Sequence, residues 1–323
     1  MKKKLLVITL ILITLLTFTG CKKSTSSSGS DDEKLVIKTA SLKGPTSIGL
    51  VGLYDKADNG KAFNIYDYNI YGTADEISTK LLKGELDAAA IPANLAAVLY
   101  NKTNGEIQIA GINTLGVLYI LAKGADINSV TDLIGKTIYT TGQGTTPEYT
   151  LRHILSEKGI DPDKDVKIEF LSEASEVVAK CSEMDSAVMM LPEPYVEVAL
   201  SKDSALMTVI DTSAEWKDVV TGVIVVRKEF AKKYHTFIDK FLEEYEDSVK
   251  FANEKPDDCA GLLEKYDIFK AETAKKAIPK CNVTLITGDE MIQKLNSYYE
   301  VLFKENPASV GGKIPSEDAY YTK

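Results

Sequence analysis

The sequence has few of the residues that build metal centres and nucleophilic active sites. Its 323 residues include only two histidines, His153 and His235, and four cysteines with no CxxC pair. With so few potential ligands, no spacing typical of a metal site appears. The chain also lacks a GxSxG motif and any cysteine close to a histidine, which argues against a serine or cysteine hydrolase. We therefore expect no catalytic residue, no metal and no cofactor.

Complete phosphate-binding motifs are missing too, although the segment TTGQGTTPEYTLRHIL at residues 140–155 has a glycine-rich turn. A P-loop needs a lysine after its second glycine, and a dinucleotide fingerprint needs a third glycine where Pro147 stands. Thr145 or Thr146 can instead cap a helix whose first turn suits Pro147 and Glu148. Two interpretations stay open: the loop amides bind an anionic or polar ligand, or the loop only caps its own helix.

Basic residues are in the minority. The chain has 38 lysines and arginines against 47 aspartates and glutamates, and three of the lysines precede residue 5. These three lysines belong to a predicted signal peptide, described below. Without them 35 basic residues remain and the net charge is about −12, which argues against a nucleic-acid partner.

The one long apolar run lies at the N-terminus. Residues 5–18 are apolar or threonine, follow three lysines and would form a helix of about 21 Å, too short to span a membrane comfortably. This pattern predicts a signal peptide over residues 1–20. The sequence around Cys21 resembles a bacterial lipoprotein signal, in which this cysteine carries fatty acids such as palmitate. The serine-rich residues after it predict a flexible tether, so that residues 21–34 are lipidated cysteine and linker. An ordinary cleaved signal with an incidental cysteine is the alternative.

The other cysteines, Cys181, Cys259 and Cys281, are expected to be small buried hydrophobic residues. A disulfide between Cys259 and Cys281 stays open.

Strand-like and helix-like segments alternate through the chain in two rounds, which predicts an α/β fold with mostly parallel sheets flanked by helices. Gly44 and Gly144 each precede a predicted helix, and Pro92 and Pro192 each end a predicted buried strand. Both pairs are offset by 100 residues, so we expect two lobes of like topology.

If the two lobes face each other, the segments SLKGPT and TTGQGTTP lie on opposite sides of one cleft. Ligands of open α/β sheets bind at the carboxyl ends of the strands, where these segments are expected. Lobes arranged in this way can close on a small molecule by a hinge motion.

Several of these motifs together resemble a known family. The segments LKGPTSIGL, GELDAAAIPANLA, TGQGTTPEYTL, LPEPYVEVAL and SVGGKIPSEDAYY, with the lipoprotein signal, are similar to extracytoplasmic solute-binding proteins of ABC importers. The branch is the one that binds nitrate, sulfonates and taurine, or thiamine precursors. The resemblance covers residues 35–321.

The resemblance implies a type II periplasmic-binding-protein fold with two lobes and a hinge of two crossovers. The first lobe would hold residues 35–118 and 223–323, the second residues 119–222, and the crossing strands would be 116–124 and 220–228. A monomer held on the outer face of the cell membrane by its lipid would capture a small organic solute. It would deliver this solute to a membrane permease and its ATPase.

The resemblance also implies the residues that contact the solute. They are Lys43, Thr46, Ser47, Thr73, Asp75, Asn94, Asn113, Thr114, Gln143, Thr145, Thr146, Glu193 and Thr221. Thr46, Thr146, Asp75 and Asn94 have a second interpretation, as caps of their helices.

Glu193 bears on the class of solute. It stands between two prolines, and a carboxylate in the cleft would disfavour a bare anion. A taurine-like zwitterion or an amino-pyrimidine would gain instead. Six tyrosines that can stack on a ring are Tyr54, Tyr71, Tyr119, Tyr139, Tyr149 and Tyr195.

Two other functions fit the same fold. One is a surface sensor that presents its ligand to a receptor. The other is an enzyme related to thiamine-pyrimidine synthesis, against which the predicted signal argues because such enzymes are cytosolic.

Overall fold

Alternating apolar side chains build a six-stranded sheet within the part of the chain that the structure describes. The computed structural model describes residues 34–322, so that the predicted signal peptide, Cys21 and nearly all of the tether lie outside the described residues. The strand order is β11-β4-β10-β3-β1-β2. The strands are β1 (Val36–Leu42), β2 (Ile65–Tyr71), β3 (Ala88–Pro92), β4 (Ile107–Leu115), β10 (Val220–Arg227) and β11 (Val283–Ile286).

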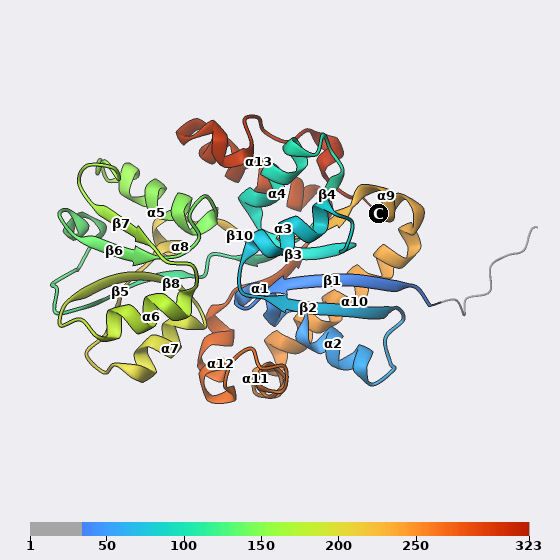
Figure 1. Cartoon of the computed structure of the whole chain (residues 1–323), viewed down its shortest axis with the longest axis horizontal. Helices are drawn as coiled ribbons and strands as arrows, with labels where there is room; N and C mark the ends of the chain where they lie inside the picture. Colours follow the sequence, from blue (N-terminus) through green and yellow to red (C-terminus); the bar gives the residue numbers. More distant parts are fainter. Residues whose placement is uncertain (1–33, 323) are drawn as a thin grey trace, which may run out of the picture. The chain divides into compact units, whose positions relative to one another are not determined.

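The period of two residues sends neighbouring side chains of a strand to opposite faces of this sheet. Ala88 and Ala90 of β3 join the apolar cluster that contains α2 and α10, whereas Ala89 and Ile91 join the cluster that contains α3, α4 and α13. Figure 1 shows these two groups of helices on the two faces of the sheet. Both faces are therefore covered, as expected for strands that are apolar on both sides.

The helices and 3₁₀ turns that precede residue 116 or follow residue 219 share this part of the fold. They are α1 (Pro45–Ile48), α2 (Val51–Asp58), α3 (Ala74–Leu82), α4 (Ala93–Lys102), α9 (Lys228–Lys233), α10 (His235–Glu254), α11 (Pro256–Lys265), α12 (Ala271–Ala277), η2 (Ile278–Lys280), α13 (Gly288–Glu305), η3 (Pro307–Val310) and η4 (Glu317–Ala319). We call this sheet with its helices the first lobe.

A second sheet, of five strands in the described part of the chain, has the order β7-β6-β8-β5-β9. Figure 1 shows α5 on one face of it and α6 and α7 on the other, and we call this sheet with its helices the second lobe. Its elements are β5 (Leu118–Lys123), η1 (Val130–Leu133), β6 (Thr137–Thr140), α5 (Thr146–Glu157), β7 (Lys167–Phe170), α6 (Ala174–Ser182), β8 (Ala187–Pro192), α7 (Tyr195–Lys202), β9 (Met207–Asp211) and α8 (Thr212–Glu215).

The two sheets repeat one topology, which confirms the expected likeness of the lobes. In each, a central parallel strand pairs with the next two strands of the chain: β1 with β2 and β3, and β6 with β7 and β8. An antiparallel strand then follows, β10 beside β3 and β5 beside β8. Pro92 and Pro192 end β3 and β8, as the offset of 100 residues predicts.

The sheets are mixed rather than mostly parallel, because in each lobe the strand that enters after a crossing runs antiparallel to its neighbours. β10 pairs antiparallel with β3 and β4, and β5 does so with β8 and β9. The sequence predicts that residues 116–124 and 220–228 cross between the lobes. Instead, β5 lies wholly within the second sheet and β10 wholly within the first. The first crossing is confined to residues 116 and 117, between β4 and β5.

No helix among residues 34–322 has both the length and the apolar character that crossing a membrane requires.

Candidate functional site

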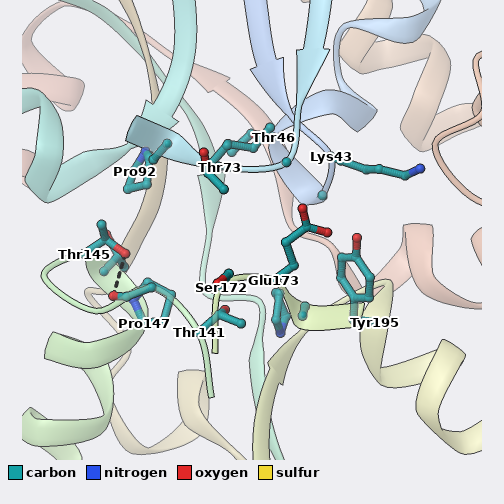
Figure 2. Close-up of a pocket in the computed structure, with 18 of the residues that line it drawn as sticks. Lys43, Thr46, Thr73, Pro92, Thr141, Thr145, Pro147, Ser172, Glu173 and Tyr195 are labelled. Atoms are coloured by element: carbon teal, nitrogen blue, oxygen red, sulfur yellow. Dashed lines mark hydrogen bonds between the residues drawn. The ribbon is translucent and has the colours of Figure 1, made fainter. Parts of the chain in front are cut away.

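A cavity of about 480 Å³ lies between the lobes, where the parallel strands of both sheets end. The first lobe contributes residues that follow β1 and β2 and the last residue of β3, and the second lobe contributes residues that follow β6, β7 and β8. Figure 2 shows Thr46 and Thr73 on one wall and Thr141 and Ser172 on the opposite wall. The cavity therefore occupies the place where open α/β sheets bind ligands.

Eight of the thirteen residues predicted to contact a solute line this cavity. They are Lys43, Thr46, Thr73, Asp75, Gln143, Thr145, Thr146 and Thr221. The segments SLKGPT and TTGQGTTP thus contribute to one shared cavity, although the α1 helix that follows the first is a single turn of four residues. Whether these residues contact a solute stays a prediction.

The other five predicted residues are buried behind the walls and are outside the cavity lining. They are Ser47, Asn94, Asn113, Thr114 and Glu193. Asn113 and Thr114 lie near the end of β4, Ser47 and Asn94 lie in the first turns of α1 and α4, and Glu193 follows β8.

Two of these buried residues form hydrogen bonds with the segment that contains Thr46. The Ser47 hydroxyl is 2.8 Å from the Ser41 hydroxyl and donates to the Leu42 carbonyl. The Asn113 side-chain amide donates to the Thr46 carbonyl at 3.3 Å. Both side chains therefore fix the backbone of the SLKGPT segment.

Two hydroxyl groups at the first-lobe wall have no hydrogen-bond partner among the described residues. They belong to Thr46 in α1 and Thr221 in β10, whose side chains are more than nine-tenths buried yet line the cavity. A buried hydroxyl without a partner costs free energy, so a hydrogen bond from either group to a bound molecule would be favourable.

The glycine-rich loop of the second lobe has its own internal bonds. Gly142 and Gly144 have φ of 75° and 73°, a conformation that favours glycine. The Gly144 N–H donates to the Glu148 carboxylate at 2.7 Å, and the Thr145 hydroxyl donates to the Gly142 carbonyl at 2.7 Å. Thr145 stands at the N-cap position of α5, but its hydroxyl bonds back into the loop and does not accept a helix N–H. The Gly144 N–H is therefore already used within the protein, so it is not free to bind a ligand as one of the two interpretations of this loop requires.

The second-lobe wall also contains four residues that the sequence did not point to, namely Thr141, Phe170, Ser172 and Glu173. The repeat contained the missing signal, because Glu173 lies 100 residues after Thr73 and follows β7 as Thr73 follows β2. Of the six tyrosines suggested for ring stacking, Tyr195 lines the cavity. Burial raises the pKa of its phenol to about 12, so the group stays a neutral donor.

The charged side chains that line the cavity are Lys43, Asp75 and Glu173. Figure 2 shows Glu173 reaching up from the second-lobe wall, whereas the Lys43 chain runs away from the centre of the cavity. A Cβ atom at Gly72, on the first-lobe wall, would lie only 2.5 Å from a Glu173 carboxylate oxygen, so glycine leaves room for this carboxylate. Of the two carboxylates expected in the cleft, Asp75 lines the cavity and Glu193 does not, whereas Glu173 adds a carboxylate that was not expected.

The family model described as NMT1-like matches residues 72–262, which is more than half of the chain. The chain belongs to the NMT1-like family. No curated protein sequence matches it.

Solved structures similar to this NMT1-like protein include an ABC transporter protein from Parabacteroides distasonis. It is 24% identical with a TM-score of 0.74, over 90% of this chain and 100% of that one. The alkanesulfonate-binding protein SsuA from Xanthomonas axonopodis pv. citri, bound to MOPS, is 13% identical with a TM-score of 0.72, over 90% and 99% of the two chains. The periplasmic nitrate-binding protein NrtA from Synechocystis PCC 6803 is 13% identical with a TM-score of 0.62, over 75% and 69%. These likenesses confirm the two-lobed type II periplasmic-binding-protein fold.

Glu193 of this NMT1-like protein lies at the junction of the lobes. Its N–H donates to the Val117 carbonyl at 3.0 Å, in the first crossing. The carboxylate is fully buried without a hydrogen-bond partner among the described residues, and the Lys280 ammonium is 3.7 Å away. Lys280 itself donates to Glu197 at 2.6 Å, so one cation of the C-terminal segment serves two carboxylates of the second lobe.

Burial raises the pKa of Glu193 from 4.5 to about 7, with Lys280 acting in the opposite direction and Glu197 adding to the rise. The buried carboxyl is therefore largely protonated below neutral pH.

Cys181, Cys259 and Cys281 are free thiols and buried. No group of histidine, cysteine, aspartate or glutamate side chains within residues 34–322 could hold a metal ion.

Glu193→Gln should change how stability depends on pH. Between about pH 4.5 and 7 the unfolded chain loses the Glu193 proton while the folded protein keeps it, so the wild type loses stability relative to the variant as pH rises. We expect a relative loss of about 3 kcal/mol over this range and a constant difference outside it. Urea unfolding at several pH values measures it, with the exposed Glu183→Gln as the control. If the free energy of unfolding depends on pH in the same way for wild type and Glu193→Gln, the raised pKa of Glu193 is contradicted.

Proposed function

We propose that this NMT1-like protein is the solute-binding component of an ABC importer. It captures a small organic solute in the cavity between its lobes and delivers it to a membrane permease that works with an ATPase. The observation that carries the proposal is a cavity with walls from two lobes, whose lining includes Thr46 and Thr221, two residues with hydroxyls that have no hydrogen-bond partner among the described residues. The solved structures of like fold, whose names include a sulfonate binder and a nitrate binder, support it.

The proposal includes the location of the protein. Residues 1–20 act as the signal peptide, and Cys21 carries the lipid that holds a monomer on the outer face of the cell membrane. The serine-rich residues that follow give the binding unit its reach from the membrane. We also propose two lobes close to the expected bounds, 35–118 with 223–323 and 119–222, but with each division up to three residues earlier, because β5 begins at Leu118 and β10 at Val220.

The charges of the cavity support a solute that carries an amine or an amino-substituted ring. Asp75 and Glu173 set two carboxylates against the single ammonium of Lys43, which points away from the centre (Figure 2). Like charges repel each other, so a bare anion such as nitrate meets an unfavourable field, which solvent weakens because these three side chains are exposed. Tyr195 and Phe170 add aromatic faces on the same wall as Glu173.

Native mass spectrometry of protein purified without refolding tests the function directly. We expect a small molecule bound without a covalent bond, which is released unchanged when the protein is denatured. An enzyme would release a converted compound. A protein that arrives empty and binds no sulfonate, amine or pyrimidine in calorimetry would contradict the proposal.

Thr46→Val and Thr221→Val should each weaken solute binding by about tenfold, because each removes one hydrogen bond to the solute. The free energy of unfolding without solute should stay the same or rise slightly, since a buried hydroxyl with no partner disappears. Isothermal calorimetry with the co-purified solute measures the affinity. Thr150→Val is the matched control, because the Thr150 hydroxyl is also buried without a partner but lies outside the cavity lining. Equal affinities in all four proteins would remove both threonines from the binding site.

Glu173→Gln should reduce selectivity for the amine. Taurine and ethanesulfonate differ by one ammonium group, and 4-amino-5-hydroxymethyl-2-methylpyrimidine and its analogue without the amino group form a second such pair. In the pair that binds, we expect the amine to bind about tenfold tighter to the wild type, and most of this advantage to vanish in Glu173→Gln. A preference that survives the substitution would show that another group recognises the amine.

A further inference from the structure

Asn94 uses its side-chain amide to join three segments of the chain. It lies in the first turn of α4 and is fully buried. Its Nδ2 group donates to the carbonyl of Gly144 at 3.0 Å and to the carbonyl of Ser309 at 3.1 Å. The side chain therefore ties the first lobe to the glycine-rich loop of the second lobe and to the C-terminal η3.

The orientation of this amide follows from its partners. Both N–H groups face carbonyl oxygens, and a reversed amide would place Oδ1 against the same two oxygens. In the observed orientation Oδ1 accepts from the Thr146 hydroxyl at 3.3 Å. Both donors and one lone pair of the amide are thus in use.

The network continues into α13. The Tyr298 hydroxyl donates to the Thr146 hydroxyl at 3.2 Å, and both side chains are fully buried. Away from water each of these bonds is stronger, and losing one leaves a buried polar group without a partner. Thr146 is therefore committed to this network, unlike Thr46, its counterpart in the first lobe.

The loop held by this network forms much of the second-lobe wall. Thr141, Gly142, Gln143, Thr145 and Thr146 all line the cavity. The other bonds described for the loop are local, within residues 142–148. The Asn94 and Tyr298 contacts are the ones that relate the loop to the opposite lobe.

We propose that Asn94 is a positioning residue, which fixes the loop of residues 141–146 against the first lobe so that its cavity-lining groups are in place before a solute binds. The inference rests on the proposed function, because it assigns the loop to the solute site. A loop ordered in advance loses less conformational entropy on binding, which improves affinity without a direct contact.

Asn101 provides a matched control on the same helix. Its Nδ2 group also donates to two carbonyls, those of Val310 at 2.6 Å and Lys313 at 2.7 Å. Both acceptors belong to the C-terminal segment. Asn101→Asp therefore disturbs the attachment of that segment, as Asn94→Asp does, but leaves the loop contact intact.

Hydrogen exchange of the solute-free protein tests the proposal. Asn94→Asp keeps the shape of the side chain but opposes a carboxylate oxygen to the Gly144 carbonyl. We expect the amides of residues 141–146 to exchange at least about fivefold faster in this variant and at the wild-type rate in Asn101→Asp. Equal rates in the two variants, whether raised or unchanged, would overturn the proposal.

Calorimetry with taurine provides the second measurement. Asn94→Asp should weaken taurine binding by about tenfold, and Asn101→Asp by less than about twofold. If the wild type does not bind taurine, the aminopyrimidine takes its place in this measurement. If the wild type binds neither compound, the proposed solute class fails, whereas the exchange rates still decide the role of Asn94. If the amides of residues 141–146 exchange faster in Asn94→Asp but its affinity for taurine is unchanged, the role of Asn94 in positioning the loop for this solute is refuted.

A milder pair of variants keeps the test decisive if Asn94→Asp does not fold. Thr146→Val removes the hydroxyl that joins Asn94 and Tyr298, and Thr150→Val removes a buried hydroxyl without a partner on the same helix. Faster loop exchange in Thr146→Val alone supports the proposal. The same exchange in both variants contradicts it.

Discussion

The two crossings of the chain between the sheets are the constraint on which the rest of this structure depends. After each crossing the chain enters the other sheet as an antiparallel strand beside the third parallel strand, β5 beside β8 and β10 beside β3. Both entering strands begin at the edge where the parallel strands end, and Leu118 and Thr221 at their starts line the cavity. The connections therefore bring the carboxyl ends of two sheets together. A site between the lobes follows from the path of the chain, because parallel strands direct the loops that follow them to one edge.

The polar groups near this edge divide into two kinds. Asn94, Ser47 and the Nδ2 group of Asn113 have hydrogen-bond partners in the protein and hold the segments that form the walls. Thr46 and Thr221 have hydroxyls without partners at the cavity surface. A buried polar group that is satisfied stiffens its surroundings, whereas one that is not satisfied favours a bound partner. The same distinction separates Thr146 from Thr46, although the repeat in the sequence makes them counterparts.

Carboxylates occur both in the cavity and behind it, and their surroundings give them different consequences. Glu173 reaches from the second-lobe wall across to Gly72, and its charge acts on whatever the cavity holds. Glu193 is enclosed at the junction of the lobes with Lys280 and Glu197 around it. Burial raises the pKa of Glu193 to about 7, so that its proton affects the stability of the folded protein. Glu173 therefore adds negative charge to the cavity, whereas Glu193 does not line it.

The sequence by itself determined the fold class, the likeness of the lobes and the segments that form the walls. These properties are local, since alternating apolar residues, turn prolines and glycines specify strands and their ends whatever lies opposite. It also placed Pro147 and Glu148 in the first turn of α5. Only the tertiary structure decided which polar side chains of those segments face the cavity. Asn94 and Glu193 follow strand ends as Thr73 and Glu173 do. Whether such a residue is buried or lines the cavity depends on contacts with residues far along the chain, such as Ser309 for Asn94 and Lys280 for Glu193. Because such contacts exist only once both sheets are assembled, the periodicity of residues along one strand does not predict them.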